Sequence, residues 1–136
     1  MKDPGEFLPK LIEICTNCGV ALAIEADIAK ASDIVAMVDK VVSEWGRLDI
    51  LVNNAGVMLL APAAEADLHD WRQMIELNLI GLMATTKAAL PHLKASKGHI
   101  VNVSSVAGRV ANPGATGYAA TKFGVVGFSE SLRREV

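Results

Sequence analysis

The sequence has few of the features that mark membrane, secreted or nucleic-acid-binding proteins. None of its apolar runs reaches membrane-spanning length, and no basic segment is followed by the apolar stretch and cleavage site of a signal peptide. Thirteen basic residues stand against fifteen acidic ones, with a formal net charge of -2 and no basic cluster. We therefore expect a cytoplasmic protein that binds neither a membrane nor a nucleic acid.

Cysteine is scarce as well. Cys15 and Cys18 have the spacing of a redox pair or of half a zinc site, but no second pair follows and no histidine lies nearby to complete a tetrahedral site. We therefore predict no metal site. The two thiols are interpreted as small packing residues at the end of a helix over 8–18 that Gly19 stops.

A glycine-rich turn between a strand and a helix is also absent from the sequence. Such a turn holds the pyrophosphate of a dinucleotide on the backbone N–H groups of a helix N-terminus. The sequence therefore offers no phosphate site of this kind.

What the chain does have is a composition that can form a core, with 51% hydrophobic residues and a mean hydropathy of +0.34. Apolar segments over 20–24, 48–52 and 100–103 predict three strands, and helical patterns separate them. Strands that are apolar on both faces and alternate with helices indicate a parallel α/β sheet.

The helical patterns have recognisable beginnings. Ser32 is the expected cap of one helix, Asp67 precedes a long second helix, and a last helix begins near residue 118. Residues 1–7 show no apolar period and include dipeptides that cloning sites encode, so they are interpreted as a vector-derived or disordered leader. The domain is then expected over 8–136.

The clearest sign of chemistry is a tyrosine followed by a lysine, Tyr118 and Lys122, within the last helix. Four residues apart, the phenol and the ammonium share one helix face, where a positive charge can make a tyrosine a usable proton donor near neutral pH. Ser105 lies thirteen residues before Tyr118, and the adjacent Ser104 is the alternative candidate for a functional serine. Taken singly, the Tyr–Lys pair suggests a solvated helix face and a strand-terminal serine suggests a turn, so the combination carries the interpretation.

In order and spacing, these motifs resemble those of the short-chain dehydrogenase/reductase family of NAD(P)-dependent oxidoreductases. The resemblance runs from about Leu8 to Val136 and implies an incomplete Rossmann-like, doubly wound parallel sheet of about three strands. The matching motifs, in chain order, are Asp27 after a strand, Asn53-Asn54-Ala55-Gly56 after the next strand, Asn78 within a helix, Ser105, Tyr118 and Lys122.

The resemblance implies hydride transfer between a nicotinamide cofactor, NAD or NADP, and a small carbonyl or alcohol substrate, with Tyr118 as general acid or base. Ser105 would hydrogen-bond the substrate oxygen, and Lys122 would hold the nicotinamide ribose. Asn78 would help to hold a water that relays protons. The alternative for Asn78 is a buried asparagine that bonds to backbone where the helix is disturbed.

The resemblance also assigns a set of cofactor-binding residues. A carboxylate at the end of the first strand could accept from the adenine amino group, and small residues after the second strand let the backbone come close to a ligand. The alternative for residues 53–56 is a strand-ending turn whose asparagine side chains bond to the sheet, and both can hold together. The assigned residues are Asp27, Ile28, Asn54, Ala55, Gly56, Tyr118 and Lys122.

Family members begin with a strand and a Thr-Gly-x-x-x-Gly-x-Gly turn, and they continue past the last helix into a substrate region. The resemblance therefore implies a central fragment, with weak or no cofactor binding. In the family's sheet order two further strands lie between the segments 20–24 and 48–52, so these segments should pair directly, leave a gap or find strands elsewhere.

The same topology predicts self-association. Right-handed crossovers place both connecting helices on one face of the sheet, and an apolar face left to water is expected to be covered in a homodimer or higher oligomer. Two functions follow, an NAD(P)-dependent oxidoreductase or a catalytically inactive, self-associating fragment that does not bind cofactor. The substrate and the choice between NAD and NADP are left open.

Overall fold

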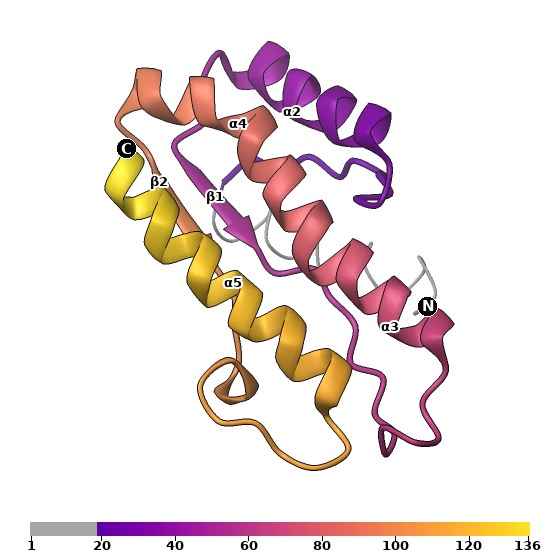
Figure 1. Ribbon diagram of the computed structural model, residues 1–136. Coiled ribbons are helices and arrows are strands. Elements are labelled where there is room, and N and C mark those ends of the chain that lie inside the picture. The colour runs from indigo at the N-terminus through magenta and orange to yellow at the C-terminus, as the bar shows by residue number, and fades with distance from the viewer. Residues whose placement is uncertain (1–18) are drawn as a thin grey trace.

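A computed structural model describes residues 19–136. The expected leader 1–7 and the expected helix over 8–18, with both cysteines, lie outside the described residues. In chain order the elements are α2 (Ala31–Trp45), β1 (Ile50–Asn53), α3 (Leu68–Ile75), the π-helical turn η1 (Glu76–Gly81), α4 (Leu82–Ser96), β2 (His99–Asn102), the 3-10 turn η2 (Val106–Gly108) and α5 (Thr116–Glu135) (Figure 1).

The sheet of the described residues has two parallel strands, which confirms the α/β class. Ile50 of β1 lies opposite His99 of β2, and this register continues to Asn53 opposite Asn102. Burial alternates along both strands, so that Leu51 and its neighbours on one face are half-buried while the residues of the other face are exposed.

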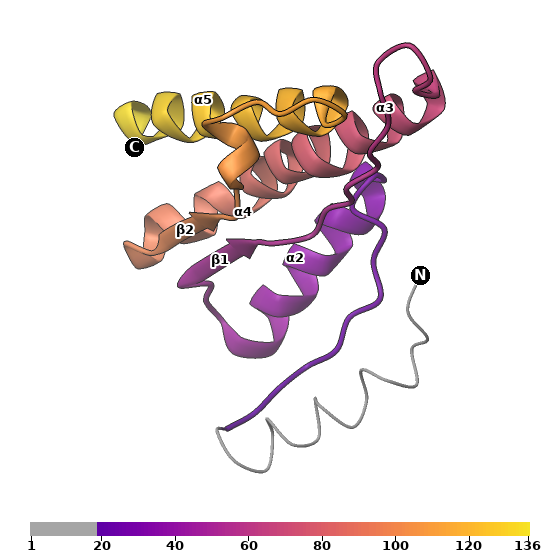
Figure 2. The same cartoon turned by 90° about the horizontal axis from the view of Figure 1, so that it is seen from below.

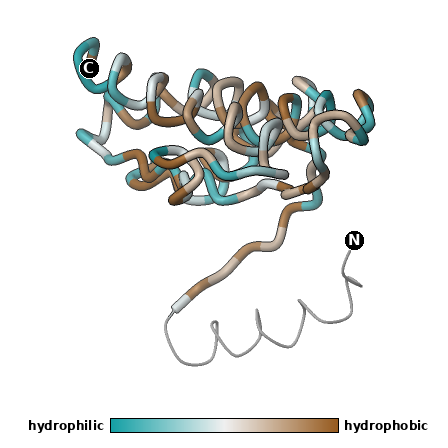
Figure 3. The backbone as a smooth tube through the Cα atoms, turned by 60° about the horizontal axis from the view of Figure 1, so that its bottom comes forward, coloured by the Kyte–Doolittle hydropathy of each residue, from teal (hydrophilic) through white to brown (hydrophobic). Residues whose placement is uncertain are grey.

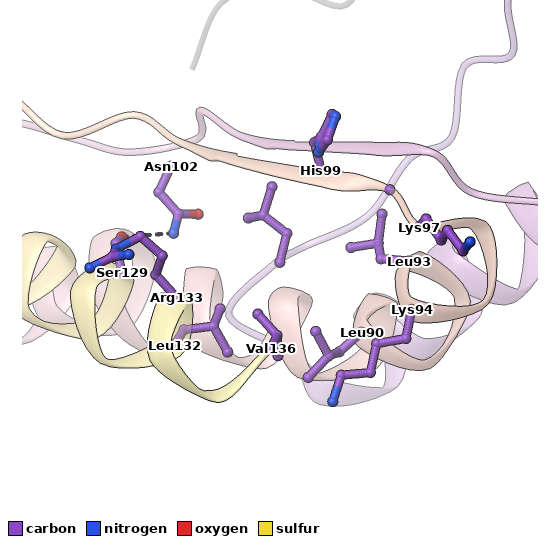
Figure 4. Close-up of a pocket in the computed structure, with 12 residues that line it drawn as sticks. Leu90, Leu93, Lys94, Lys97, His99, Asn102, Ser129, Leu132, Arg133 and Val136 are labelled. Atoms are coloured by element: carbon purple, nitrogen blue, oxygen red, sulfur yellow. Dashed lines mark hydrogen bonds between the residues drawn. The ribbon is translucent and has the colours of Figure 1, made fainter.

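Helices α2 and α4 cover the same face of the sheet, as the crossover argument predicts. Val38 of α2 packs with Ala89 and Leu93 of α4, and the half-buried Leu51 and Ile100 of the strands pack against this cluster. Figure 4 shows α4 and α5 side by side below β2, with His99 pointing to the opposite side. The described helices therefore lie on one side of the strands.

The prediction of a strand over 20–24 is wrong. These residues lie outside the sheet, and Val20 is 87% exposed. Figures 2 and 3 show the beginning of the described chain standing away from the folded body, although Figure 3 colours much of it as hydrophobic. An apolar run becomes a strand only where a neighbouring strand edge meets its backbone, and the first of the three expected outcomes, direct pairing with β1, does not occur.

The prediction that Ser32 caps the helix is also wrong. Lys30 is its N-cap residue and makes no side-chain cap, while Ser32 lies inside the helix and donates to the Asp33 carboxylate at 3.2 Å. The other oxygen of the Asp33 carboxylate accepts from the backbone N–H of Asp27 at 3.1 Å, so Asp33 connects the helix to the chain before it. Gly46 ends α2 in the left-handed conformation with φ 72°, as expected.

The expected long helix is confirmed, with one irregularity. Asp67 caps α3 by accepting from the His69 N–H at 2.8 Å, and helical backbone then continues through η1 and α4 with Pro91 tolerated inside. The turn widens to a π-helix over η1, which ends at Gly81. A Cβ at Gly81 would lie 2.7 Å from the Ile28 carbonyl oxygen, so glycine lets the chain before α2 approach this helix closely.

None of the helices in the described part of the chain is both long and apolar enough to cross a membrane.

Candidate active site

Tyr118 and Lys122 lie in the first turns of α5, beside the end of β2. The Lys122 side chain is only 6% exposed, and its ammonium donates to the carbonyl oxygen of Val103, the residue after β2, at 2.8 Å. The same Nζ atom lies 5.8 Å from the centroid of the Tyr118 ring, within the range of a cation–π contact. The structure therefore brings the two residues together, as their spacing predicts.

The charge of Lys122 is not neutralised by a carboxylate in the described chain, since none of the ion pairs found there includes it. A buried ammonium without a carboxylate partner favours negative charge on a nearby oxygen. The arrangement can therefore stabilise an oxygen atom that gives up a proton beside it.

The two serines after β2 have different surroundings. Ser104 Oγ donates to the backbone carbonyl of Lys122 at 3.1 Å, which ties the end of the strand to α5. Ser105 Oγ accepts from the Ala107 N–H at 3.2 Å, and among the described residues it donates to no protein atom. The hydroxyl hydrogen of Ser105 is therefore available to a ligand, whereas that of Ser104 is in use.

Asn78 projects from η1 and is 1% exposed. Its Oδ1 accepts from the Val57 N–H at 2.8 Å, and its Nδ2 donates to the Val57 carbonyl at 2.8 Å and to Thr121 Oγ1 at 3.2 Å. This is the alternative geometry expected for Asn78, a buried amide bonded to backbone where the helix is disturbed. In the described chain the amide bonds to neither the Tyr118 nor the Lys122 side chain.

The run from Asn53 to Gly56 combines a structural asparagine with an exposed turn. Asn53 Nδ2 donates to Thr86 Oγ1 at 2.9 Å and to Asn102 Oδ1 at 2.8 Å, so this side chain joins β1 to α4 and β2. The following residues 54–56 are exposed. A Cβ at Gly56 would lie 2.9 Å from Asn78 Oδ1, so the turn rests directly on the buried asparagine.

Asp27, which is exposed, and Ile28, which is half-buried, form a separate turn before α2. The Asp27 carboxylate accepts from the Ala29 N–H at 3.0 Å and lies 3.5 Å from the Lys30 ammonium. The Ile28 carbonyl packs against Gly81 at the end of η1. This turn therefore meets the same irregular helix that carries Asn78.

Four further residues shape the site, and sequence reasoning did not single them out. Val57 and Thr121 are the partners of Asn78, and Gly81 and Gly108 allow close backbone approach; a Cβ at Gly108 would lie 2.6 Å from Ser104 Oγ and 2.7 Å from the Lys122 carbonyl. Thr121 could have been found from its position, because residues three apart on a helix share a face and Thr121 follows Tyr118 by three. An isolated glycine within a helical pattern was the available signal for Gly81.

A hollow in the described structure lies away from these residues. A groove of about 730 Å³ runs between α4, β2 and α5, with Leu90, Leu132 and Val136 along it and the Asn102–Ser129 hydrogen bond at one end (Figure 4). Neither Tyr118 nor Lys122 lines it. Within the described residues no group of three His, Cys, Asp or Glu side chains could hold a metal ion.

The fold and the site together define a Rossmann-like α/β protein in which Tyr118 and the buried Lys122 lie side by side at the carboxyl end of β2. A family model for short-chain dehydrogenases matches residues 6–136. The chain therefore belongs to the short-chain dehydrogenase family.

Several similar proteins are oxidoreductases by name. A 3-oxoacyl-[acyl-carrier-protein] reductase of Synechocystis is 38% identical over 125 residues, which cover 91% of this chain and 51% of that protein. The corresponding FabG reductase of Staphylococcus aureus is 41% identical over 117 residues, covering 85% of this chain and 48% of the relative. The chain thus spans about half the length of the curated relatives that it matches.

Among solved structures, an alcohol dehydrogenase of the archaeon Thermococcus sibiricus, complexed with 5-hydroxy-NADP, has a TM-score of 0.90 and 28% sequence identity. The superposition covers 97% of this chain and 57% of the archaeal chain.

Proposed function

We propose that this chain carries the proton-transfer site of an NAD(P)-dependent oxidoreductase that interconverts a carbonyl and an alcohol. The observation that carries the proposal is the buried Lys122 ammonium, held between the Val103 carbonyl and the ring of Tyr118. When bound, a nicotinamide cofactor would supply or accept the hydride, with its two electrons, at the carbonyl carbon.

In this proposal Tyr118 gives its phenolic proton to the substrate oxygen during reduction and takes it back during oxidation. The negative charge that forms on the phenol oxygen is stabilised by the Lys122 ammonium. Ser105 donates its available hydroxyl hydrogen to the same substrate oxygen, which holds the carbonyl in place as charge develops there.

We propose that the chain's own residues hold part of a nicotinamide cofactor. The exposed turn 54–56 and the Asp27–Ile28 turn would hold the adenosine side, and Tyr118 and Lys122 would lie at the nicotinamide side. The sequence supplies no glycine-rich turn for the pyrophosphate. We therefore expect weak binding of NADH or NADPH by this chain, with a dissociation constant of about 1 mM, or about 4 kcal/mol of binding free energy.

Substitution of Tyr118 by phenylalanine tests the proposed role of Tyr118. With NADPH and an acetoacetyl thioester as probe, chosen because two relatives are named as 3-oxoacyl reductases, Tyr118→Phe should lower the rate of carbonyl reduction by about 10² to 10⁴. Phe123→Leu, an exposed change in the same helix, is the control and should leave the rate unchanged. Equal rates for Tyr118→Phe and the unmodified chain would show that another group provides the proton.

The second candidate is a self-associating chain without catalytic activity or cofactor binding. It is favoured by the face of the sheet that no described helix covers, where Ile50, Val52, Val101 and, just after β2, Val103 are 58%, 55%, 48% and 38% exposed. We propose that a second copy of the chain covers this face, because water-exposed apolar surface of this kind favours association.

Sedimentation and a cofactor titration separate the two candidates. Val101→Lys should convert a dimer into a monomer, while the control Val35→Lys, at a 51% exposed valine of α2, should not. A dimer that shows no heat of NADPH binding and no reductase activity would favour the second candidate. A monomeric unmodified chain would contradict the proposed association.

A further inference from the structure

The buried Thr121 joins the two parts of the site. It lies in α5 between Tyr118 and Lys122, is 1% exposed and makes two hydrogen bonds. Its hydroxyl donates to the Tyr118 carbonyl at 2.8 Å and accepts from Asn78 Nδ2 at 3.2 Å. Asn78 in turn holds both backbone groups of Val57, the residue after the exposed turn 54–56.

The directions of these bonds follow from chemistry. A threonine hydroxyl has one hydrogen, and because the Tyr118 carbonyl can only accept, that hydrogen points to Tyr118. The bond with Asn78 must therefore come from the asparagine N–H. The Val57 N–H and carbonyl fix the same amide orientation independently, so every partner in the chain Val57–Asn78–Thr121–Tyr118 is consistent with one arrangement.

A second buried threonine shows what is particular about Thr121. Thr85 is 5% exposed and its hydroxyl donates to the Gly81 carbonyl four residues earlier at 2.8 Å, which is an ordinary bond within one helix. Thr121 makes a comparable bond to its own helix and in addition reaches an asparagine 43 positions away in sequence. Only the second bond connects separate elements.

We propose that Thr121 is a positioning residue, which fixes the Tyr118–Lys122 turn of α5 against the turn 54–56 through Asn78. The inference rests on the proposed function, because the position of the Tyr118 phenol matters to a bound cofactor and substrate. Without the hydroxyl, one N–H of the buried Asn78 amide loses its partner and α5 loses this connection to η1. A small displacement of a proton donor is enough to lower a reaction rate strongly.

The structural part of the inference can be tested without activity, because Tyr118 is the only tyrosine in the chain. In the full chain with ring-labelled tyrosine and labelled asparagine amides, Thr121→Val should shift the Tyr118 ring signals and the Asn78 side-chain amide signals. Thr121→Ser should keep both near their original positions, and the matched control Thr85→Val should leave both unchanged. If Thr121→Val moves neither signal, or Thr85→Val moves them equally, the inference is wrong.

The unmodified chain provides a measurement that does not depend on the folding of a variant. A nuclear Overhauser contact is expected between the Asn78 side-chain amide and the Thr121 hydroxyl or methyl group. If Thr121→Val fails to fold, this contact together with normal behaviour of Thr121→Ser supports the proposal, and absence of the contact overturns it.

The functional part is tested by separating kcat from KM. With NADPH and an acetoacetyl thioester, Thr121→Val should lower kcat by about 10- to 100-fold with little change in KM for NADPH, and Thr121→Ser should restore the rate. A change in KM alone, or a loss that serine does not rescue, would contradict a positioning role. If the unmodified chain has no reductase activity, the proposed function fails, while the spectroscopic results still decide whether Thr121 positions Tyr118.

Discussion

The two halves of the candidate site are held in different ways. Asn78, Thr121 and Lys122 are at most 6% exposed, and each bonds to an element far away in the sequence. Asp27 and Asn54 are exposed, and the bonds of Asp27 reach no further than Asp33, six positions away. The buried side chains of the proton-transfer half are therefore held by tertiary hydrogen bonds, whereas the Asp27 carboxylate is held by residues of its own turn. Substitutions of the buried residues of the first half should change both stability and chemistry, and substitution of the exposed Asp27 should change mainly ligand affinity.

Substitution of a buried and of an exposed lysine should give the largest difference in unfolding free energy and in reduction rate. Lys122→Met leaves the Val103 carbonyl without its donor, so we expect a loss of about 1–3 kcal/mol in the free energy of unfolding. The same change should lower the rate of carbonyl reduction by at least about 10², because the charge beside Tyr118 is gone. Lys30→Met, at the exposed partner of Asp27, should change the unfolding free energy by no more than about 0.5 kcal/mol. Urea unfolding and steady-state rates measure both, and equal effects would remove the distinction between the two halves.

Two glycines compare a packed position beside Lys122 with an open position further along α5. A Cβ at Gly108 would meet Ser104 Oγ and the Lys122 carbonyl at 2.6 and 2.7 Å, so Gly108→Ala must push η2 and α5 apart at a cost of about 1–3 kcal/mol. Gly127, inside α5, has nothing within 4 Å of its Cβ position, and Gly127→Ala should stabilise the helix by about 0.5–1 kcal/mol. Thermal unfolding should therefore show a lower melting temperature for Gly108→Ala and a higher one for Gly127→Ala. A tolerated alanine at Gly108 would show that the packing around Lys122 is looser than the structure describes.

The two neighbouring serines should separate chemistry from stability. Ser104→Ala removes a hydroxyl that donates to the Lys122 carbonyl, so we expect a loss of about 1 kcal/mol in unfolding free energy and a mild effect on the rate. Ser105→Ala should do the reverse, because its hydroxyl hydrogen is not used within the described chain. Parallel unfolding and rate measurements on both variants check this, and the account is contradicted if Ser104→Ala lowers the rate more than Ser105→Ala.

The smallest expected effect lies at the exposed end of α5, away from the site. Hydrogen bonds from Arg133 and Arg134 lower the pKa of Glu130 below its ordinary value of 4.5. A depressed folded-state pKa means that this interaction stabilises the fold at pH values above the ordinary value and is lost as the pH falls through the depressed one. Glu130→Gln should therefore slightly reduce the acid sensitivity of the melting temperature between neutral pH and about pH 3. An unchanged pH profile would mean that the exposed pairs contribute nothing measurable.

Local patterns predicted much of the fold. The parallel pairing of β1 and β2, the helices on one face, the cap at Asp67 and the stop at Gly46 all follow from periodicity, capping and crossover handedness. The strand at 20–24 and the cap at Ser32 were wrong. A strand forms only where a neighbouring strand edge can pair with its backbone. Helix α2 begins at Ala31, one residue before Ser32, and the side chain that bonds back to the chain before the helix is the Asp33 carboxylate, which accepts from the Asp27 N–H.

The candidate site was predictable in its parts but not in its connections. The juxtaposition of Tyr118 and Lys122 follows from helical spacing, and the structure confirms it, while their chemical roles remain predictions. The bond between Asn78 and Thr121 joins positions 43 apart, and the fit of Gly108 against Lys122 depends on how η2 folds back on α5. No local pattern encodes such contacts, because they arise only when the elements pack.

The most direct test of the central claim follows the ring signals of Tyr118, the only tyrosine, while NADP⁺ is added to the full chain up to about 10 mM, a range that covers weak binding. If Tyr118 and Lys122 form the proton-transfer site beside the nicotinamide, the ring signals should move along a saturable curve. Asp27→Asn should shift the curve to higher NADP⁺ concentration while leaving its end point unchanged. Ring signals that stay constant throughout the titration would contradict the account.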